Sequence, residues 1–531
     1  MDNLFLTGFM GTGKTAVGRS LASRLGRRFV DLDQEIERAG GASVADIFAR
    51  FGEGEFRERE RRALERSAGL ERAVVATGGG VVMDARNREI MHASGKIVCL
   101  RADPPTILSR VGDAADRPLL AAAADCTEKI RRLLGERAAA YADADYAVDT
   151  SGRSVADVVE EILRWVDAHR EPSMREIRVT LGARSYPILI GDGWLDRIGG
   201  RVREVLGGKA IRAAIVSDSR VAPLYVPRVA ASLREAGFAV AEIQIPGGEQ
   251  HKNLAWLALT YDRLIEARID RSSPVVAVGG GVVGDLAGFA AATILRGVPF
   301  VQVPTTLLAQ VDASVGGKTG INHAAGKNLI GAFHQPRLVA IDVDTLKTLP
   351  QREYLSGLAE VVKYGAILDA ELFARLEASV PALLRQETGL LGDVIATSCR
   401  LKAMVVEEDE TEGGYRAILN FGHTLGHAIE TLTEYRRLLH GEAVAIGMVC
   451  AARLSRSLGW LDAESVGRIE RLLDALGLPT RVPGDLSADQ LALAIEADKK
   501  AAGGKITFVC LEAVGRTRFE PLSAAEIAHA L

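Results

Sequence analysis

Residues 8–15 read Gly-Phe-Met-Gly-Thr-Gly-Lys-Thr, and this motif indicates the fold of the first part of the chain. It fits the pattern G-x-x-x-x-G-K-[ST] of loops that bind polyphosphates. We expect an apolar strand before it at residues 3–7. A helix should follow it, because Val17, Leu21 and Leu25 are four residues apart and Gly26 ends the run. Backbone N–H groups and a helix N-terminus would then surround a phosphate, with Lys14 at the outer phosphates and Thr15 on Mg²⁺. The alternative is a chance glycine turn.

Two carboxylates follow the second expected strand, residues 28–32. Alternation along that strand predicts that Asp31 and Asp33 point to one side, near the end where ligands of α/β proteins bind. One would orient Mg²⁺ and its waters, and the other would accept a hydrogen bond from a substrate hydroxyl. The alternative is an aspartate that only caps a helix.

Four further motifs follow in order: Glu-Phe-Arg at 55–57, Gly-Gly-Gly at 78–80, Asp-Arg-Pro-Leu at 116–119, and Arg137 with Tyr141. Taken singly, Arg57, Arg117 and Arg137 would be solvated surface charges. Together with the loop and Asp-Leu-Asp at 31–33, the order resembles shikimate kinase over residues 1 to about 165.

This resemblance implies ATP-dependent phosphorylation of shikimate by positioning and charge neutralisation. It implies that Asp31 supports Mg²⁺ through water, that Arg117 belongs to a lid over ATP, and that Lys14 and Asp33 serve catalysis. The implied shikimate contacts are Asp33, Arg57, Gly79 and Arg137, and the implied ATP contacts are Gly11, Thr12, Gly13, Lys14, Thr15, Ala16 and Arg117.

Composition narrows the class of protein. The 531 residues predict two or three domains, and a net charge of −4 gives no support for a nucleic-acid partner. The five cysteines form no C-x-x-C pair, which favours a reducing compartment over a disulfide scaffold. The first residues lack a basic signal-peptide start, and the apolar stretch 274–299 reads as a buried strand, a glycine turn and a helix. We therefore expect a soluble, cytoplasmic protein without a membrane partner.

The chain divides into four segments by its pattern of apolar and polar residues. Residues 1–168 alternate strands and helices as an α/β kinase-type unit with a parallel sheet, and a polar linker is expected at 169–176. Residues 177–345 are again rich in strands and predict a Rossmann-like α/β NAD-binding part. Residues 346–531 predict a mainly α-helical metal-binding part.

Glycines follow an expected strand in the second part as well. Residues 279–281, Gly284 and Asp285 come after the apolar run 275–278 and before a helix. The spacing is not G-x-G-x-x-G, so the standard Rossmann fingerprint is absent. Glycines after a strand still suit a pyrophosphate; the alternative is that the loop is only a tight turn. Beyond it, Lys318 and Lys327 stand beside glycines and could bring ammonium groups to a phosphate or carboxylate.

Three of the nine histidines fall within 18 residues. His423 and His427 are at i, i+4 and could both bind zinc, as in H-E-x-x-H, or be polar helix residues with local hydrogen bonds. His440 and Glu360 favour a metal site, and nitrogen and carboxylate ligands without cysteine suggest Zn²⁺.

The motifs of this part closely resemble 3-dehydroquinate synthase over about 177–531. They include Pro-Gly-Gly-Glu-Gln-His-Lys at 246–252, the run 303–322, Gly-Lys-Asn at 326–328, Glu-Val-Val-Lys-Tyr-Gly at 360–365, the run 419–427 and His-Gly-Glu-Ala-Val at 440–444. The resemblance implies that Glu360, His423 and His440 bind Zn²⁺ (or Co²⁺). It places His427 on the substrate side, against the i, i+4 pairing, and we follow it.

The same resemblance implies the remaining contacts. Catalytic roles fall to Lys318, Lys363, Arg416 and His427. The NAD contacts are Asp218, Glu249, Lys252, Gly280, Gly281, Asp285, Thr305, Thr306, Lys318 and Lys327. The substrate contacts are Arg296, Asp312, Lys318, Lys327, Asn328, Lys363, Lys402, Arg416, Asn420 and His427, with a further phosphate contact from Lys499 or Lys500.

The implied substrate is 3-deoxy-arabino-heptulosonate 7-phosphate. Transient oxidation of one carbon acidifies the adjacent C–H, phosphate leaves, the hydride returns, and ring opening with aldol closure gives 3-dehydroquinate. The expected protein is a bifunctional shikimate-pathway enzyme with ATP, Mg²⁺, NAD⁺ and Zn²⁺, and with a possible homodimer through the second half. The alternatives are a small-alcohol kinase joined to a zinc-dependent polyol dehydrogenase, or a chain in which one half is only a binding or regulatory module.

Overall fold

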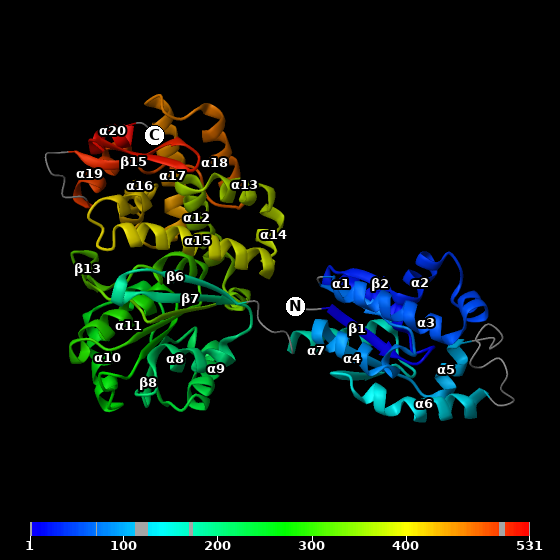
Figure 1. Ribbon diagram of the computed structural model, residues 1–531. Coiled ribbons are helices and arrows are strands. Elements are labelled where there is room, and N and C mark those ends of the chain that lie inside the picture. Colours follow the sequence, from blue (N-terminus) through cyan, green and yellow to red (C-terminus); the bar gives the residue numbers. More distant parts are fainter. Residues whose placement is uncertain (1–2, 71, 112–125, 169–173, 499–504, 530–531) are drawn as a thin grey trace. The chain divides into compact units, whose positions relative to one another are not determined.

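The computed structural model describes residues 3–70, 72–111, 126–168, 174–498 and 505–529 (Figure 1). The chain folds as two compact units, Met1–Glu171 and Pro172–Leu531. Each unit has hydrophobic clusters of its own, so each is described by itself.

The first unit is built on a parallel sheet of five strands in the order β2-β3-β1-β4-β5. The strands are β1 (Asn3–Gly8), β2 (Arg28–Asp31), β3 (Ala73–Ala76), β4 (Gly95–Arg101) and β5 (Tyr146–Asp149). The helices are α1 (Lys14–Leu25), α2 (Leu32–Gly40), α3 (Val44–Ala68), α4 (Ala85–Ser94), α5 (Pro104–Val111), α6 (Cys126–Ala142) and α7 (Val155–Ala168). The predicted α/β kinase-type fold is confirmed, and β1 and β2 each end within one residue of the strands predicted at 3–7 and 28–32.

Strand alternation gives this sheet two apolar faces. Leu4 and Leu6 of β1 pack in the cluster that contains Val17 and Leu21 of α1, whereas Phe5 packs in the opposite cluster. Because both faces are covered by helices, the strands are almost continuously apolar.

The second unit contains a seven-stranded sheet in the order β6-β7-β14-β11-β10-β8-β9. The strands are β6 (Arg175–Val179), β7 (Tyr186–Gly191), β8 (Arg212–Asp218), β9 (Ala239–Ile245), β10 (Val275–Gly279), β11 (Phe300–Pro304) and β14 (Leu338–Asp342). All neighbours are parallel except β6 and β7. Arg175 pairs with Ile190, so the predicted linker 169–176 is wrong at its end, where β6 has already begun.

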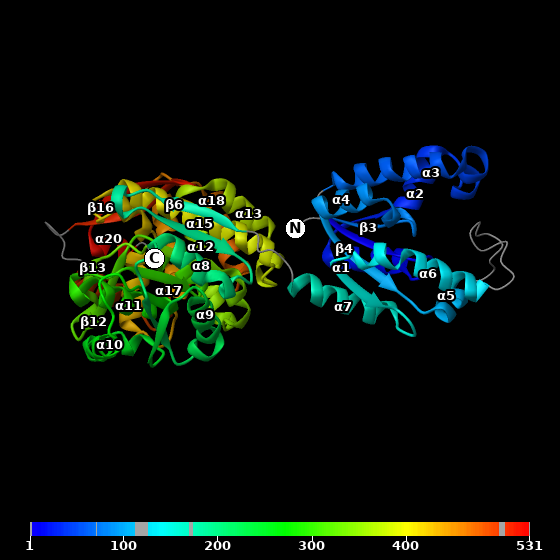
Figure 2. The ribbon, with the colours of Figure 1, turned by 60° about the horizontal axis from the view of Figure 1, so that its bottom comes forward.

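Helices cover both faces of this sheet (Figure 2). Helices α8 (Ile198–Leu206) and α9 (Ala222–Glu235) share a core with Val276 and Val278, and α10 (Leu254–Glu266) and α11 (Gly281–Thr293) share one with Val275 and Ala277. The apolar stretch 274–299 is therefore β10, a glycine turn and α11, as predicted. Within the described ranges, no helix is long and apolar enough to cross a membrane.

The rest of the second unit is mainly helical and lies above the sheet in Figure 1. Its helices are α12 (Gln351–Leu368), α13 (Ala370–Ala378), α14 (Val380–Leu384), α15 (Thr388–Glu408), α16 (His423–Leu432), α17 (His440–Ser457), α18 (Ala463–Ala475), α19 (Ala488–Asp498) and α20 (Ala524–His529). Two hairpins complete the unit: β12 (Lys318–His323) with β13 (Gly326–Phe333), and β15 (Ile506–Ala513) with β16 (Arg516–Leu522).

Candidate functional sites

The phosphate-binding loop lies between the end of β1 and the start of α1. Gly11 and Gly13 have φ angles of 76° and 94°, which L side chains rarely adopt. Lys14 Nζ donates hydrogen bonds to the carbonyl oxygens of Gly8 and Phe9, both at 2.9 Å. The loop thus carries an ammonium group at a helix N-terminus, where anions bind.

Asp31 joins this loop to the next helix. Its Oδ2 accepts a hydrogen bond from Thr15 Oγ1 at 2.8 Å, and its Oδ1 accepts one from the backbone N–H of Asp33 at 3.2 Å. Asp33 lies in the first turn of α2, so the predicted strand alternation is wrong, because the chain turns into a helix at Leu32. Asp31 therefore caps α2, as in the alternative reading, while it also faces Thr15.

The glycine turn at residues 78–80 collects the predicted shikimate contacts. The carbonyl oxygen of Gly79 accepts hydrogen bonds from Arg137 Nη1 at 3.2 Å and from Tyr141 Oη at 2.8 Å. Arg137 also lies over the ring of Phe9, 5.5 Å from its centroid. Arg137 therefore contacts both the glycine turn and the phosphate-binding loop.

Arg57 and Asp33 touch the same turn. A Cβ on Gly80 would lie 2.5 Å from Arg57 Nη1, and one on Gly78 would lie 3.0 Å from Asp33 Oδ1. The structure thus brings Asp33, Arg57, Gly79 and Arg137 together around one backbone turn. Arg117 lies outside the described residues.

Sequence reasoning missed Glu60 in this cluster. Its side chain is 1% exposed, and its Oε2 pairs with Arg57 Nη1 at 2.7 Å. Burial raises the pKa of Glu60, although Arg57 opposes that shift. The spacing of Arg57 and Glu60 at i, i+3 on an expected helix was the available signal.

The predicted NAD contacts gather where β8, β10 and β11 end, and these three strands are neighbours in the sheet. Asp218 is the last residue of β8, and Gly280 precedes α11. The N–H of Thr305 donates to the carbonyl oxygen of Gly279 at 3.0 Å, and a Cβ on Gly280 would lie 3.1 Å from the methyl carbon of Thr306. Ligands of open α/β sheets bind at such carboxyl ends.

A buried lysine ties this edge to the β12–β13 hairpin. Lys252 Nζ pairs with Asp285 Oδ2 at 2.5 Å and donates to Asn328 Oδ1 at 2.6 Å. Asn322, which sequence reasoning missed, donates to Glu249 Oε1 at 2.8 Å. The hairpin that carries Lys318, Lys327 and Asn328 is therefore anchored to the predicted NAD contacts.

Asp312 lies in a single π-helical turn, Ala309–Ala313, and faces the helical part. Its Oδ1 accepts a hydrogen bond from Tyr364 Oη at 2.8 Å and pairs with Lys402 Nζ at 2.5 Å. Burial lowers the pKa of Lys402 to about 8, while Asp312 opposes that shift. Burial raises the pKa of Asp312, but Lys402 and Lys363 outweigh it and hold the carboxyl well below its usual range.

Arg416 is 2% exposed and donates to the carbonyl oxygens of Glu410 at 2.6 Å and Gly316 at 3.4 Å. Lys318 forms an ion pair with Glu412, a residue that the sequence reasoning did not name. A buried cation held by carbonyl oxygens beside a glycine turn is a ready contact for an anion.

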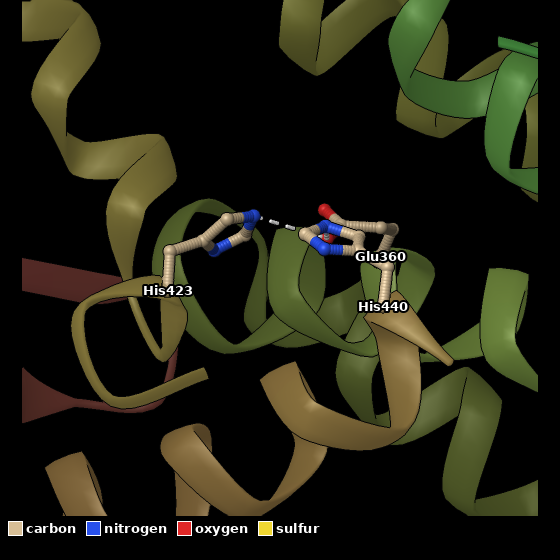
Figure 3. A group of neighbouring side chains, drawn as sticks. All are labelled: Glu360, His423 and His440. Atoms are coloured by element: carbon tan, nitrogen blue, oxygen red, sulfur yellow. Dashed lines mark ion pairs between the residues drawn. The ribbon is translucent and has the colours of Figure 1, made fainter. Parts of the chain in front are cut away.

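Three ligand-type side chains converge from α12, α16 and α17 (Figure 3). His423 Nε2 lies 3.3 Å and His440 Nε2 lies 3.5 Å from Glu360 Oε1, and the three ligand atoms lie within 4.8 Å of one another. Glu360 is fully buried in an ion pair with Lys363, and neither of its oxygens accepts a hydrogen bond from any described residue. Two imidazoles and one carboxylate fit a zinc-type ion with an open position.

His427 lies beside this group rather than inside it. Its ring centroid is 5.4 Å from that of His423 and 6.0 Å from that of His440. A second set of ligand-type atoms within 4.8 Å consists of His427, Glu430 and His440. Glu430 was missed, although it continues the helix face of His423 and His427.

Electrostatics distinguish the histidines of the group. Burial and Lys363 lower the pKa of His423 to about 4. Burial also acts to lower the pKa of His440, but the neighbouring carboxylates of Glu360 and Glu430 outweigh it and raise that pKa to about 10.

Two predicted substrate contacts are not drawn into these networks. Arg296 is exposed in a left-handed conformation with φ of 66°, and no hydrogen bond or ion pair in the described ranges joins it to the others. Asn420 is the last residue of a 3₁₀ helix, Tyr415–Asn420. It lies two residues before Gly422, the N-cap of α16. Lys499 and Lys500 lie outside the described residues.

The two folds and their sites define the class: a phosphate-loop kinase unit followed by a dinucleotide- and metal-dependent α/β–α enzyme. Family models match the chain in three places: shikimate kinase at residues 10–167, 3-dehydroquinate synthase N-terminal at 242–356, and 3-dehydroquinate synthase C-terminal at 357–501. The chain belongs to the 3-dehydroquinate synthase family, and its first unit is a shikimate kinase domain.

Curated relatives match the second unit almost over their full length. The 3-dehydroquinate synthase of Citrifermentans bemidjiense is 56% identical over 348 residues, which cover 66% of this chain and 95% of the relative. The 3-dehydroquinate synthase of Geobacter sp. strain M21 is 55% identical with the same coverage.

Solved structures agree with this fold. A 2-deoxy-scyllo-inosose synthase complexed with carbaglucose-6-phosphate, NAD⁺ and Co²⁺ is 27% identical, covers 67% of this chain and 99% of its own, and has a TM-score of 0.62. A 2-epi-5-epi-valiolone synthase from Streptomyces hygroscopicus with NAD⁺ and Zn²⁺ bound is 29% identical, covers 66% of this chain and 97% of its own, and has a TM-score of 0.61.

Proposed function

We propose that this chain carries two enzymes of the shikimate pathway: an ATP-dependent shikimate kinase and a 3-dehydroquinate synthase. The observation that supports this most is that the two compact units match family models of two different enzymes of that pathway.

In the kinase unit, the loop residues Gly11 to Ala16 bind ATP. Lys14 neutralises charge on the transferred phosphate, and Thr15 holds Mg²⁺, with Asp31 acting through water. The position of Asp31 supports this, because its Oδ2 accepts a hydrogen bond from the Thr15 hydroxyl at 2.8 Å.

Shikimate binds at the glycine turn. Arg57 and Arg137 bind its carboxylate, and Asp33 accepts a hydrogen bond from the attacking hydroxyl. The support for these roles is that all three side chains lie against residues 78–80. Arg117, which lies outside the described residues, is assigned to ATP binding by the family resemblance alone.

In the synthase unit, Glu360, His423 and His440 would hold Zn²⁺ or Co²⁺, and the ends of β8, β10 and β11 would hold NAD⁺. When bound, these groups supply transient oxidation of one substrate carbon and polarisation of its hydroxyls. Lys318, Lys327, Lys363, Lys402 and Arg416 bind and orient the phosphate and carboxylate of 3-deoxy-arabino-heptulosonate 7-phosphate. His427 moves a proton on the substrate side, with Asp312, Asn328 and Asn420 as further contacts.

A homodimer through the synthase half is part of the proposal. Strand β13 exposes Leu329, Ile330 and Phe333 directly after the substrate-site residues Lys327 and Asn328. An apolar edge beside a site is a candidate interface between copies. A single monomeric species at micromolar concentration in sedimentation would contradict it.

We further place the protein in the cytoplasm, with small molecules rather than nucleic acids or membranes as partners. The free cysteines support a reducing compartment. Recovery of the protein in a membrane pellet after cell fractionation would oppose this placement.

Two variants test the assignment. Lys14→Ala should abolish phosphorylation of shikimate and leave the synthase unchanged, whereas His440→Ala should lose bound zinc and synthase activity and leave the kinase unchanged. Both reactions are assayed on each purified full chain. Release of free NADH by the wild type would contradict the redox-neutral synthase reaction and favour a polyol dehydrogenase.

A further inference from the structure

Glu430 is a buried carboxylate of α16 that none of the roles above uses. It lies three residues after His427 and seven after His423, and its side chain is 5% exposed. Burying a charged carboxylate is costly unless it is paired, so its partners indicate its purpose.

One oxygen of Glu430 faces a proposed zinc ligand. Glu430 Oε2 lies 3.1 Å from His440 Nδ1, while the other ring nitrogen, Nε2, lies 3.5 Å from Glu360 Oε1. The two nitrogens of His440 therefore face different carboxylates. A histidine that binds a metal through Nε2 presents Nδ1–H as a donor, and an acceptor there fixes the tautomer and the ring orientation.

The other oxygen faces a proposed substrate ligand. Glu430 Oε1 lies 3.4 Å from Lys327 Nζ, which comes from the β12–β13 hairpin. The same ammonium lies 3.8 Å from the ring centroid of Tyr435. Tyr435 and its neighbour Glu434 have φ angles of 56° and 53°, a left-handed pair that costs free energy in residues other than glycine. The strained turn places the ring over Lys327 and limits where its ammonium can lie.

We propose that Glu430 is a positioning residue of the synthase, which orients the His440 ring for the metal and holds the ammonium of Lys327 for the substrate. This inference rests on the proposed function for the identity of the metal and the substrate. Through one carboxylate, the metal site in the helical part is joined to the anion-binding hairpin of the α/β part.

The test uses the full chain and two substitutions that separate the two contacts. Glu430→Gln keeps an oxygen that can accept from His440 but removes the charge that holds Lys327. Glu430→Leu removes both contacts. Glu464→Gln is the matched control, because Glu464 is an exposed glutamate in the first turn of α18 and forms no ion pair with His440 or Lys327.

Zinc affinity is measured by competition with a chromophoric chelator, and kcat and KM are measured at saturating zinc. In Glu430→Leu, zinc affinity should fall about 10–100-fold, as for other carboxylates behind a metal-bound histidine. In Glu430→Gln, affinity should fall less, while the KM for the heptulosonate phosphate rises several-fold. That rise should disappear when the same change is made in a Lys327→Met background. Kinase activity and thermal unfolding show whether each variant is folded.

Wild-type zinc affinity in folded Glu430→Leu would overturn the proposal. A second equivalent of zinc that binds the wild type and is lost in Glu430→Gln would also overturn it, because Glu430 would then be a ligand in its own cluster with His427 and His440. A wild type that binds zinc but does not turn over the substrate would refute the proposed function instead, and the zinc titrations would still decide the role of Glu430.

Discussion

Gly447→Ala is expected to damage the metal site without touching any of its ligands. Gly447 lies on α17, two turns after His440, where the helix crosses the start of α16. A Cβ on Gly447 would lie 2.8 Å from the carbonyl carbon of Gly422 and closer still to its oxygen. Gly422 directly precedes His423, so this contact holds the start of α16 against the helix whose first residue is His440, another proposed zinc ligand.

The size of the effect follows from that overlap. Ordinary contacts begin at 3.4 Å, so the two backbones must separate by at least about 0.6 Å. Backbone atoms cannot rotate aside as a side chain can, and overpacking of this kind costs about 1–3 kcal/mol. Metal–ligand distances tolerate only about ±0.2 Å. We therefore expect lower thermal stability of the synthase unit, and zinc affinity reduced by tenfold or more.

The assays are zinc competition, thermal unfolding and both enzyme activities on one preparation. Kinase activity should be unchanged. Gly389→Ala is the matched control: Gly389 also lies in a helix, α15, but its Cβ would meet nothing within 4 Å, so this change should stabilise by up to about 1 kcal/mol. Wild-type zinc affinity in Gly447→Ala would refute the view that this helix contact sets the ligand spacing.

Three further outcomes are expected. The pKa of Lys402 is lowered to about 8, so its ammonium loses its proton as the pH rises through that value. We therefore expect kcat/KM of the synthase to fall above about pH 8. The Lys402→Arg variant should not show that alkaline fall. Chelation followed by Mg²⁺ should restore the kinase alone, with the synthase recovering only on addition of Zn²⁺ or Co²⁺, and Mg²⁺ rescue of both would contradict separate metal chemistries. Residues 1–171 and 172–531, produced as separate chains, should each fold and keep their activity, since each has its own core; a large loss with both pieces folded would indicate a functional interface.

Features that depend only on neighbouring residues could be predicted from the sequence. The phosphate loop is predictable because strand, glycines and helix follow one another within about 25 residues, and backbone conformation there is local. Strands β1, β2 and β10 were located because period-two and continuous apolar runs reflect burial directly. The family resemblances also come from such short motifs.

Tertiary structure decided the features that depend on packing between distant elements. The helical position of Asp33 is a local exception, because the cap by Asp31 ends β2 one residue earlier than alternation assumed. Glu430 gains its partners, Lys327 and His440, only when α16 meets the β12–β13 hairpin and the start of α17. The spacing of Glu360, His423 and His440 is set by glycine contacts between α12, α16 and α17, since a Cβ at Gly441 or Gly447 would collide with a neighbouring backbone. A sequence pattern can indicate which residue types are present. The precise placement of three helices relative to one another comes from the packing of the whole core.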